Sequence, residues 1–303
     1  MEKIFSFKAV LMIFLIWILS TPVLAQDLPA IVSADWLEAN LKNPRLIVLD
    51  VRKVEDYREG HIPNAVNLYY GAWAYKKGEL YTEVPDPDDL DDTIGSTGVG
   101  WDSWVVIVGK MNTLKEVYQN YRVACTLRYA GLDNVSLLDG GMNKWIRDKK
   151  PLSMDVVRAK EKLFKGKYKK DHFADKEYVQ NRMGKIVLLD VREADIFTGK
   201  RKLDCITKLG HIPGAVNLST SCAFNNDGTL KNKEVLTALV EAAVGKDRST
   251  EIVTYCDVGQ CCPVWKYLMK RVLGYKNVRI YDGAMQEWTL DPDAPVELNQ
   301  TTK

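Results

Sequence analysis

The chain has 303 residues, of which 46% are hydrophobic and 27% charged, and its formal net charge is +2 at pH 7. This composition excludes a disordered or fibrous chain, and six cysteines are too few for a disulfide-rich scaffold. Because 42 basic residues balance 40 acidic ones, the charge does not favour a nucleic-acid partner, and at about 150 residues per domain the length predicts two globular domains.

The first 25 residues are typical of an export signal. Lys3 and Lys8 precede an apolar run over residues 9–19, and small residues end at Ala25. The run is short for a membrane span of about 20 residues, so we interpret this segment as a signal peptide cleaved after Ala25 rather than as an uncleaved anchor. We therefore expect an exported protein, periplasmic or extracellular, with no stable membrane insertion after cleavage.

The two halves of the remaining chain repeat one order of motifs. Each half contains an Asp-Val-Arg motif, a Gly-His-Ile-Pro motif and a closing Asp-Gly-x-Met motif. These stand at residues 50–52, 60–63 and 139–142 in the first half and at 190–192, 210–213 and 282–285 in the second. The period of about 140 residues is too long for a solenoid, so the repeat indicates a duplicated domain.

Short β-rich apolar runs alternate with helical patterns along each half. We predict a strand over 104–108 and a helix over 114–130, then strands over 186–189, 215–218, 252–255 and 278–281 with helices over 234–244 and 264–273. Apolar strands separated by helices imply a buried, mostly parallel sheet. The expected fold is α/β, with two tandem domains that each have a mostly parallel central sheet and helices on both faces.

The repeat also sets the expected domain boundaries. We assign residues 26–150 to an N-terminal domain and 173–303 to a C-terminal domain. The segment 151–172 between them is rich in lysine and poor in apolar residues, so we interpret it as a solvated linker.

The loop after the strand at 252–255 holds a candidate nucleophile, Cys256. Ligands of open parallel sheets bind beyond the carboxyl ends of the strands, and Pro263 suits the first turn of a following helix. Loop N–H groups and a helix N-terminus favour an anion, so they should lower the pKa of the Cys256 thiol. The alternative is a buried structural cysteine, but the strand-end position and Gly259 in a tight loop favour a functional one.

Together these motifs resemble the rhodanese (sulfurtransferase) family, over nearly all of residues 30–290. The resemblance implies a tandem-rhodanese fold with only the C-terminal half catalytic. Cys256 would take a sulfane sulfur from a small donor such as thiosulfate, 3-mercaptopyruvate or polysulfide. It would then pass the sulfur from a persulfide to cyanide, a thiol or a carrier protein. This chemistry needs no metal and no organic cofactor.

The resemblance also implies which residues surround Cys256. The substrate-binding loop would comprise Asp257, Val258, Gly259, Gln260, Cys261 and Cys262. Arg192 matches a family arginine near this loop, although a structural ion pair is its favoured role. Asp50 and His61 match positions that, in the mercaptopyruvate branch, contribute to the interdomain cleft, but such residues more often stabilise the fold. The first half has no cysteine at its loop position, and we expect Cys125 to be a core residue.

The loop departs from the family pattern after Cys256. Thiosulfate-type loops place cations there, and mercaptopyruvate-type loops read Cys-Gly-(Ser/Thr)-Gly-Val-Thr. An inward-facing Asp257 would oppose a low thiol pKa and repel an anionic donor, whereas an outward-facing one would be harmless near the helix N-terminus. Cys261 could resolve a persulfide into a disulfide, or Cys261 and Cys262 could simply pack inward.

Three functions therefore stay open. The first is a sulfurtransferase that uses Cys256, and the second is an exported thiol-disulfide redox protein that uses Cys256 and Cys261. The third is a non-catalytic rhodanese-like binding module, which the presence of Cys256 disfavours. Cys205 and Cys222 could in addition form a disulfide, which spacing alone does not decide.

Overall fold

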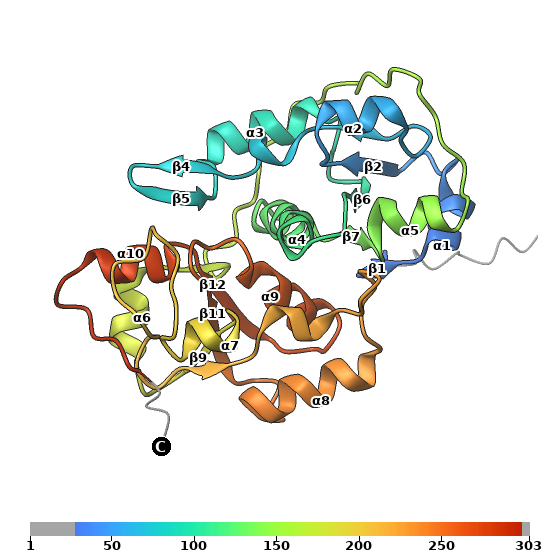
Figure 1. The fold of residues 1–303 in the computed structure, drawn as a ribbon. Helices are drawn as coiled ribbons and strands as arrows, with labels where there is room; N and C mark the ends of the chain where they lie inside the picture. Colours follow the sequence, from blue (N-terminus) through green and yellow to red (C-terminus); the bar gives the residue numbers. More distant parts are fainter. Residues whose placement is uncertain (1–27, 299–303) are drawn as a thin grey trace, which may run out of the picture.

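The fold is described from a computed structural model that covers residues 28–298. It has two domains of the same architecture, each with a five-stranded, wholly parallel sheet between helices (Figure 1). The expected α/β tandem fold is therefore confirmed. The export signal expected over residues 1–25 lies outside the described residues. Within them, no helix combines the length and apolarity that a bilayer crossing requires.

Strand order is the same in both sheets. The N-terminal sheet, in the order β1-β7-β6-β2-β3, consists of β1 (Ile31–Val32), β2 (Leu46–Asp50), β3 (Val66–Asn67), β6 (Trp104–Val108) and β7 (Val135–Leu138). The C-terminal sheet, in the order β8-β12-β11-β9-β10, consists of β8 (Phe173–Ala174), β9 (Val187–Asp190), β10 (Val216–Asn217), β11 (Glu251–Tyr255) and β12 (Asn277–Tyr281). The duplicated motifs thus correspond to a duplicated topology.

Ten helices of the described chain accompany the strands. They are α1 (Ala34–Asn40), α2 (Val54–Glu59), α3 (Pro87–Ser96), α4 (Leu114–Tyr129) and α5 (Gly141–Arg147), then α6 (Lys176–Arg182), α7 (Ala194–Phe197), α8 (Lys233–Val244), α9 (Cys262–Arg271) and α10 (Ala284–Leu290). A capping box between Thr113 and Glu116 begins α4. The strand predicted at 104–108 coincides with β6, and the helix predicted over 264–273 begins two residues earlier, at Cys262.

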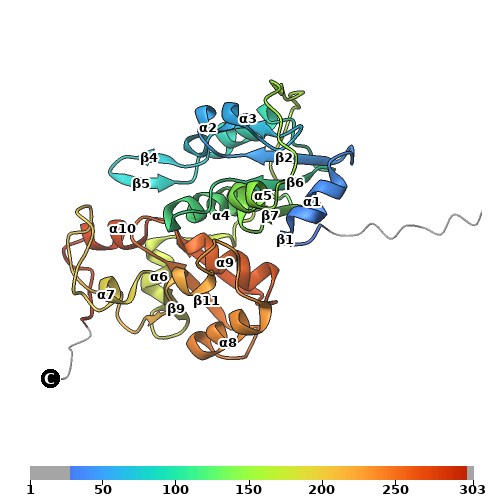
Figure 2. The ribbon, with the colours of Figure 1, turned by 45° about the vertical axis from the view of Figure 1, so that its right-hand side comes forward.

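The two domains pack through α4 and α9, which lie side by side in both views (Figures 1 and 2). Tyr121 on α4 meets Tyr267 on α9 edge to face, with ring centroids 5.6 Å apart. One continuous cluster of buried apolar side chains includes residues of both domains. Because this shared core fixes the domains to each other, the N-terminal domain can contribute residues to a site at the start of α9.

The segment 151–172 is docked rather than free. Phe164 is 3% exposed and stacks on Trp101 with centroids 5.2 Å apart. The backbone N–H of Lys167 donates to the Ala130 carbonyl at 2.9 Å. The interpretation as a solvated linker is therefore only partly right, since one apolar anchor and backbone hydrogen bonds attach it to the N-terminal domain.

An antiparallel hairpin of β4 (Tyr75–Lys77) and β5 (Leu80–Glu83) was not foreseen from the sequence. It projects from the N-terminal domain toward α10 of the other domain (Figure 1). The Tyr81 N–H donates to the Gln286 side chain at 3.0 Å, and the Gln286 amide donates to the Glu79 carbonyl at 2.8 Å. The hairpin is thus a second bridge between the domains.

Candidate active site

Cys256 follows the last residue of β11, in the middle of the C-terminal sheet. The chain then turns through residues 257–261 into α9, whose first turn contains Pro263. Only 1% of Cys256 is exposed. The register between β9 and β11 sets Tyr255 opposite Asp190, which places the loop beside the Asp-Val-Arg motif. The thiol therefore stands at the carboxyl edge of the sheet, where parallel-sheet proteins bind ligands.

Hydrogen-bond donors converge on the Cys256 sulfur. The Cys261 backbone N–H donates to Sγ at 3.4 Å, and the Cys262 thiol lies 3.9 Å from it. Burial alone would raise the pKa of the Cys256 thiol, but hydrogen bonds from the thiols and backbone amides of Cys261 and Cys262 outweigh it and hold the pKa well below its usual value. The loop thus stabilises a thiolate without a neighbouring base.

The loop rests on the closing motif of the second repeat. The Met285 N–H donates to the Cys256 carbonyl at 3.0 Å, and the Gln286 N–H donates to the Asp257 carbonyl at 2.9 Å. Gly259 has a φ of +75°, and a Cβ there would lie 2.5 Å from the Asp282 carbonyl oxygen. Because any other residue would place its Cβ against that oxygen, only glycine fits at position 259. The Asp-Gly-x-Met motif therefore supports the loop that bears the thiol.

Arg122 on α4 connects the N-terminal domain to this loop. Its side chain is 1% exposed and forms an ion pair with Asp282, with Nη2 2.8 Å from Oδ2. The guanidinium also donates to the Gly259 carbonyl at 3.1 Å and to the Thr82 carbonyl at 2.8 Å. Arg122 lies in no repeated motif, so the sequence pattern does not single it out. The position of its partner Asp282 in the repeated closing motif is the one sequence signal that points toward this pair.

Two tyrosines of the N-terminal domain face the same loop. The Gln260 side-chain amide donates to the Tyr70 hydroxyl at 3.4 Å. Burial, with Cys261 and Glu193 nearby, raises the pKa of Tyr118, which stays a neutral phenol. Together with Arg122, these tyrosines form the N-terminal side of the site.

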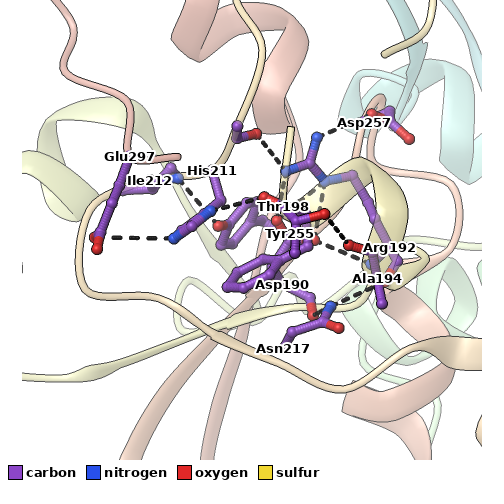
Figure 3. A network of polar contacts seen from close by, with 12 residues as sticks. Asp190, Arg192, Ala194, Thr198, His211, Ile212, Asn217, Tyr255, Asp257 and Glu297 are labelled. Carbon is purple, nitrogen blue, oxygen red and sulfur yellow. Dashed lines mark hydrogen bonds and ion pairs between the residues drawn. The ribbon is translucent and has the colours of Figure 1, made fainter. Parts of the chain in front are cut away.

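Asp257 faces inward and is paired. Arg192 Nη1 lies 3.3 Å from Asp257 Oδ1 and Nη2 lies 2.6 Å from Asp190 Oδ2, so one buried guanidinium serves two carboxylates (Figure 3). Burial raises the pKa of Asp257 to about 6, against the lowering effect of Arg192. Arg192 has the structural ion pair expected of it, and it also connects the Asp-Val-Arg motif to the loop.

The N-terminal domain repeats this site without a thiol. Asp50 pairs with Arg52 at 2.7 Å, and the Met142 N–H donates to the Gly109 carbonyl as the Met285 N–H does to that of Cys256. Gly109 is therefore the structural counterpart of Cys256. A cavity of about 500 Å³ beside it is lined by Arg52 and Lys110 among others. The domain keeps the scaffold but lacks the nucleophile.

Asp50 and His61 are not brought to Cys256. The His61 ring stacks on Tyr57 at 3.8 Å, and its Nδ1 lies 2.9 Å from the Tyr57 carbonyl oxygen. Within the described chain, the hydrogen bonds of Asp50 and His61 stay in the N-terminal domain and the segment that follows it. These contacts fit the fold-stabilising role favoured for both residues, and the N-terminal side chains that contact the Cys256 loop include Arg122 and Tyr70.

The remaining cysteines lie outside the loop. Cys125 is buried on α4, with its Sγ 3.5 Å from the Pro263 carbonyl oxygen. Cys205 and Cys222 are free thiols that pack against two different apolar clusters. The suggested Cys205–Cys222 disulfide is not formed.

The rhodanese-like domain model matches residues 33–148 and 175–291, so the chain belongs to the rhodanese family. A protein of Mycolicibacterium smegmatis named "Putative thiosulfate sulfurtransferase" is 32% identical over 276 residues, which cover 88% of this chain and 97% of that protein. A Haloferax volcanii protein of the same name is 31% identical over 283 residues, with coverage of 88% and 96%.

Solved structures agree with this assignment. The crystal structure of SseA from Escherichia coli, described as a 3-mercaptopyruvate sulfotransferase, has a TM-score of 0.74 at 25% identity, covering 84% of this chain and 98% of SseA. The structure of YnjE has a TM-score of 0.78 at 23% identity, covering 89% of this chain and 68% of that chain, and indicates the shared fold alone.

Proposed function

We propose that this rhodanese-family protein is a sulfurtransferase of the thiosulfate/3-mercaptopyruvate type in which Cys256 carries the sulfur. The observation that supports this most directly is the Cys256 thiol at the end of β11, with its pKa held well below the usual value by donors of the loop. The names of the similar proteins from Mycolicibacterium smegmatis and Haloferax volcanii, and that of SseA, support the same chemistry.

The transfer takes place in two steps. The Cys256 thiolate attacks the transferable sulfur of the donor and forms a sulfur–sulfur bond. The S–S bond of thiosulfate or polysulfide, or the C–S bond of 3-mercaptopyruvate, breaks at the same time, and sulfite, a shortened polysulfide or the pyruvate enolate leaves with the electron pair. The Cys261 N–H and the loop around it stabilise the negative charge of the persulfide. A thiol, cyanide or protein acceptor then attacks the outer sulfur and regenerates the thiolate.

The charges around the loop influence the choice of donor. Arg192 is paired with Asp190 and Asp257, and Arg122 is paired with Asp282. Because both arginines are already neutralised, a dianion such as thiosulfate gains little attraction. We therefore expect 3-mercaptopyruvate, which carries a single carboxylate charge, to load Cys256 more readily than thiosulfate.

A steady-state assay with two substrates tests this proposal. With 3-mercaptopyruvate or polysulfide as donor and cyanide as acceptor, we expect thiocyanate and parallel lines in double-reciprocal plots, since the persulfide separates the two half-reactions. Cys256→Ser should abolish turnover, whereas Cys222→Ser, which changes a half-buried thiol outside the loop, should leave it unchanged. Full turnover by Cys256→Ser would contradict the proposal.

Export to the periplasm or the extracellular space is part of the same proposal. Its support is the charged start, the apolar run and the small residues up to Ala25. Mass spectrometry of the protein from the native host should find a mature chain that begins at Gln26. An intact chain that still begins at Met1 would contradict cleavage.

A further inference from the structure

A second thiol lies directly against the Cys256 sulfur. Cys262 is the first residue of α9, is fully buried, and has its Sγ 3.9 Å from Cys256 Sγ. The same thiol lies 3.4 Å from the Gly259 carbonyl oxygen. Burial and the contact with Cys256 raise the pKa of Cys262, so it bears the proton that the Cys256 thiolate accepts. The described loop therefore pairs a thiolate with a protonated thiol.

We propose that Cys262 resolves the Cys256 persulfide, releases its outer sulfur as hydrogen sulfide, and leaves a Cys256–Cys262 disulfide. This inference rests on the proposed function, because it begins from the persulfide. It adds a second activity, reductive sulfide release, to the transfer of sulfur to an external acceptor. It also assigns the resolving role to Cys262 rather than to Cys261, which the spacing had suggested.

The position of Cys262 suits an attack on the inner sulfur. Cys262 has no accessible surface and meets Cys256 from the protein interior. Displacement at the Cys256 sulfur requires the attacking and leaving sulfurs to lie on opposite sides of Sγ. We therefore expect the outer sulfur of the persulfide to point away from Cys262. Cys261 is 8% exposed and contributes its backbone N–H at 3.4 Å instead.

The step balances without an external oxidant. A bond forms between the sulfurs of Cys262 and Cys256, and the bond between Cys256 and the outer sulfur breaks. The persulfide anion first takes up the Cys262 proton, so that Cys262 attacks as the thiolate and the outer sulfur leaves with the electron pair as hydrosulfide. The sulfane sulfur is thereby reduced to sulfide, and the two cysteines are oxidised to a disulfide. A dithiol reductant, which returns two electrons and two protons, must restore the thiols for another cycle.

Loading with polysulfide or 3-mercaptopyruvate, followed by removal of the donor and anaerobic incubation without acceptor, tests this step. Intact mass and released sulfide are followed together. The wild type should first gain the mass of a sulfur atom. It should then lose that sulfur and two hydrogens relative to the reduced protein, with one sulfide released per persulfide. Dithiothreitol should restore the starting mass.

Two variants separate the possible outcomes. Cys262→Ala should keep the added sulfur and release no sulfide, whereas the control Cys222→Ser, which changes a free thiol outside the loop, should behave as the wild type does. Cys262→Ser, which is closer in size, repeats the test if the alanine variant does not fold. Sulfide release by both Cys262 variants, or a wild-type persulfide that persists, overturns this inference alone. A protein that never gains sulfur from any donor overturns the proposed function as well.

Discussion

Arg122 is one of the N-terminal residues that contact the Cys256 loop, together with Tyr70 and Thr82. Arg122→Met keeps much of the side-chain volume but removes the ion pair with Asp282 and the hydrogen bonds to the Gly259 and Thr82 carbonyls. Because it leaves the Asp282 carboxylate largely buried without its cation, we expect the free energy of unfolding to fall by about 3–5 kcal/mol. Without these contacts the Cys256 loop shifts, and we expect Cys256 to accept sulfur from the donor about tenfold to a hundredfold more slowly.

Urea unfolding and the rate of sulfur loading measure these two effects. The double variant Arg122→Met with Asp282→Asn is the matched control, since it leaves no uncompensated charge. We expect it to regain most of the lost stability, so that the two changes are strongly non-additive. A single variant that loses less than about 1 kcal/mol and loads sulfur at the wild-type rate would refute the role assigned to Arg122.

Three further predictions concern residues around the loop. Asp257 has a pKa of about 6, so its negative charge is lost as the pH falls from 7 to 5. Loading from thiosulfate, measured relative to loading from 3-mercaptopyruvate, should then rise roughly fivefold, or about 1 kcal/mol. Asp257→Asn should show the higher ratio at every pH, and a ratio that falls at low pH would refute this reasoning. Gly259→Ala should abolish sulfur loading of Cys256 while the fold is retained, because its Cβ would lie 2.5 Å from the Asp282 carbonyl oxygen. Loading at the wild-type rate would show that the loop does not need the close contact between residue 259 and Asp282. Gln286→Ala removes two hydrogen bonds to the β4–β5 hairpin, which should cost about 1–2 kcal/mol and speed amide exchange over residues 75–83. Unchanged exchange would mean that the hairpin is held elsewhere.

The sequence was sufficient for the features that local pattern encodes. The apolar runs predict the parallel strands, the duplicated motifs predict two domains of one design, and the position of Cys256 after a strand predicts a loop thiol. These features depend on neighbours within one element or one turn. Periodicity and turn chemistry therefore suffice to find them.

Contacts between distant segments were not predictable in the same way. Arg122 and Asp282 are 160 residues apart, and Tyr81 is 205 residues from Gln286. No local pattern reports such pairs, so the sequence offered only Asp50 and His61 as possible contributors to the interdomain cleft, with stabilisation of the fold as their favoured role. The choice between Cys261 and Cys262 depends on how the start of α9 turns, because one residue along a helix changes the direction of a side chain by about 100°.

Mass spectrometry of the peptide that contains Cys256, Cys261 and Cys262 decides whether Cys256 is the residue that carries the sulfur. The protein is treated with a sulfur donor, quenched with an alkylating reagent before the persulfide decays, and fragmented. We expect an added sulfur on Cys256 in the wild type and none on this peptide in Cys256→Ser. An added sulfur on Cys261 or Cys262 in the Cys256→Ser protein, or an unmodified wild-type peptide with every donor, would contradict that role of Cys256.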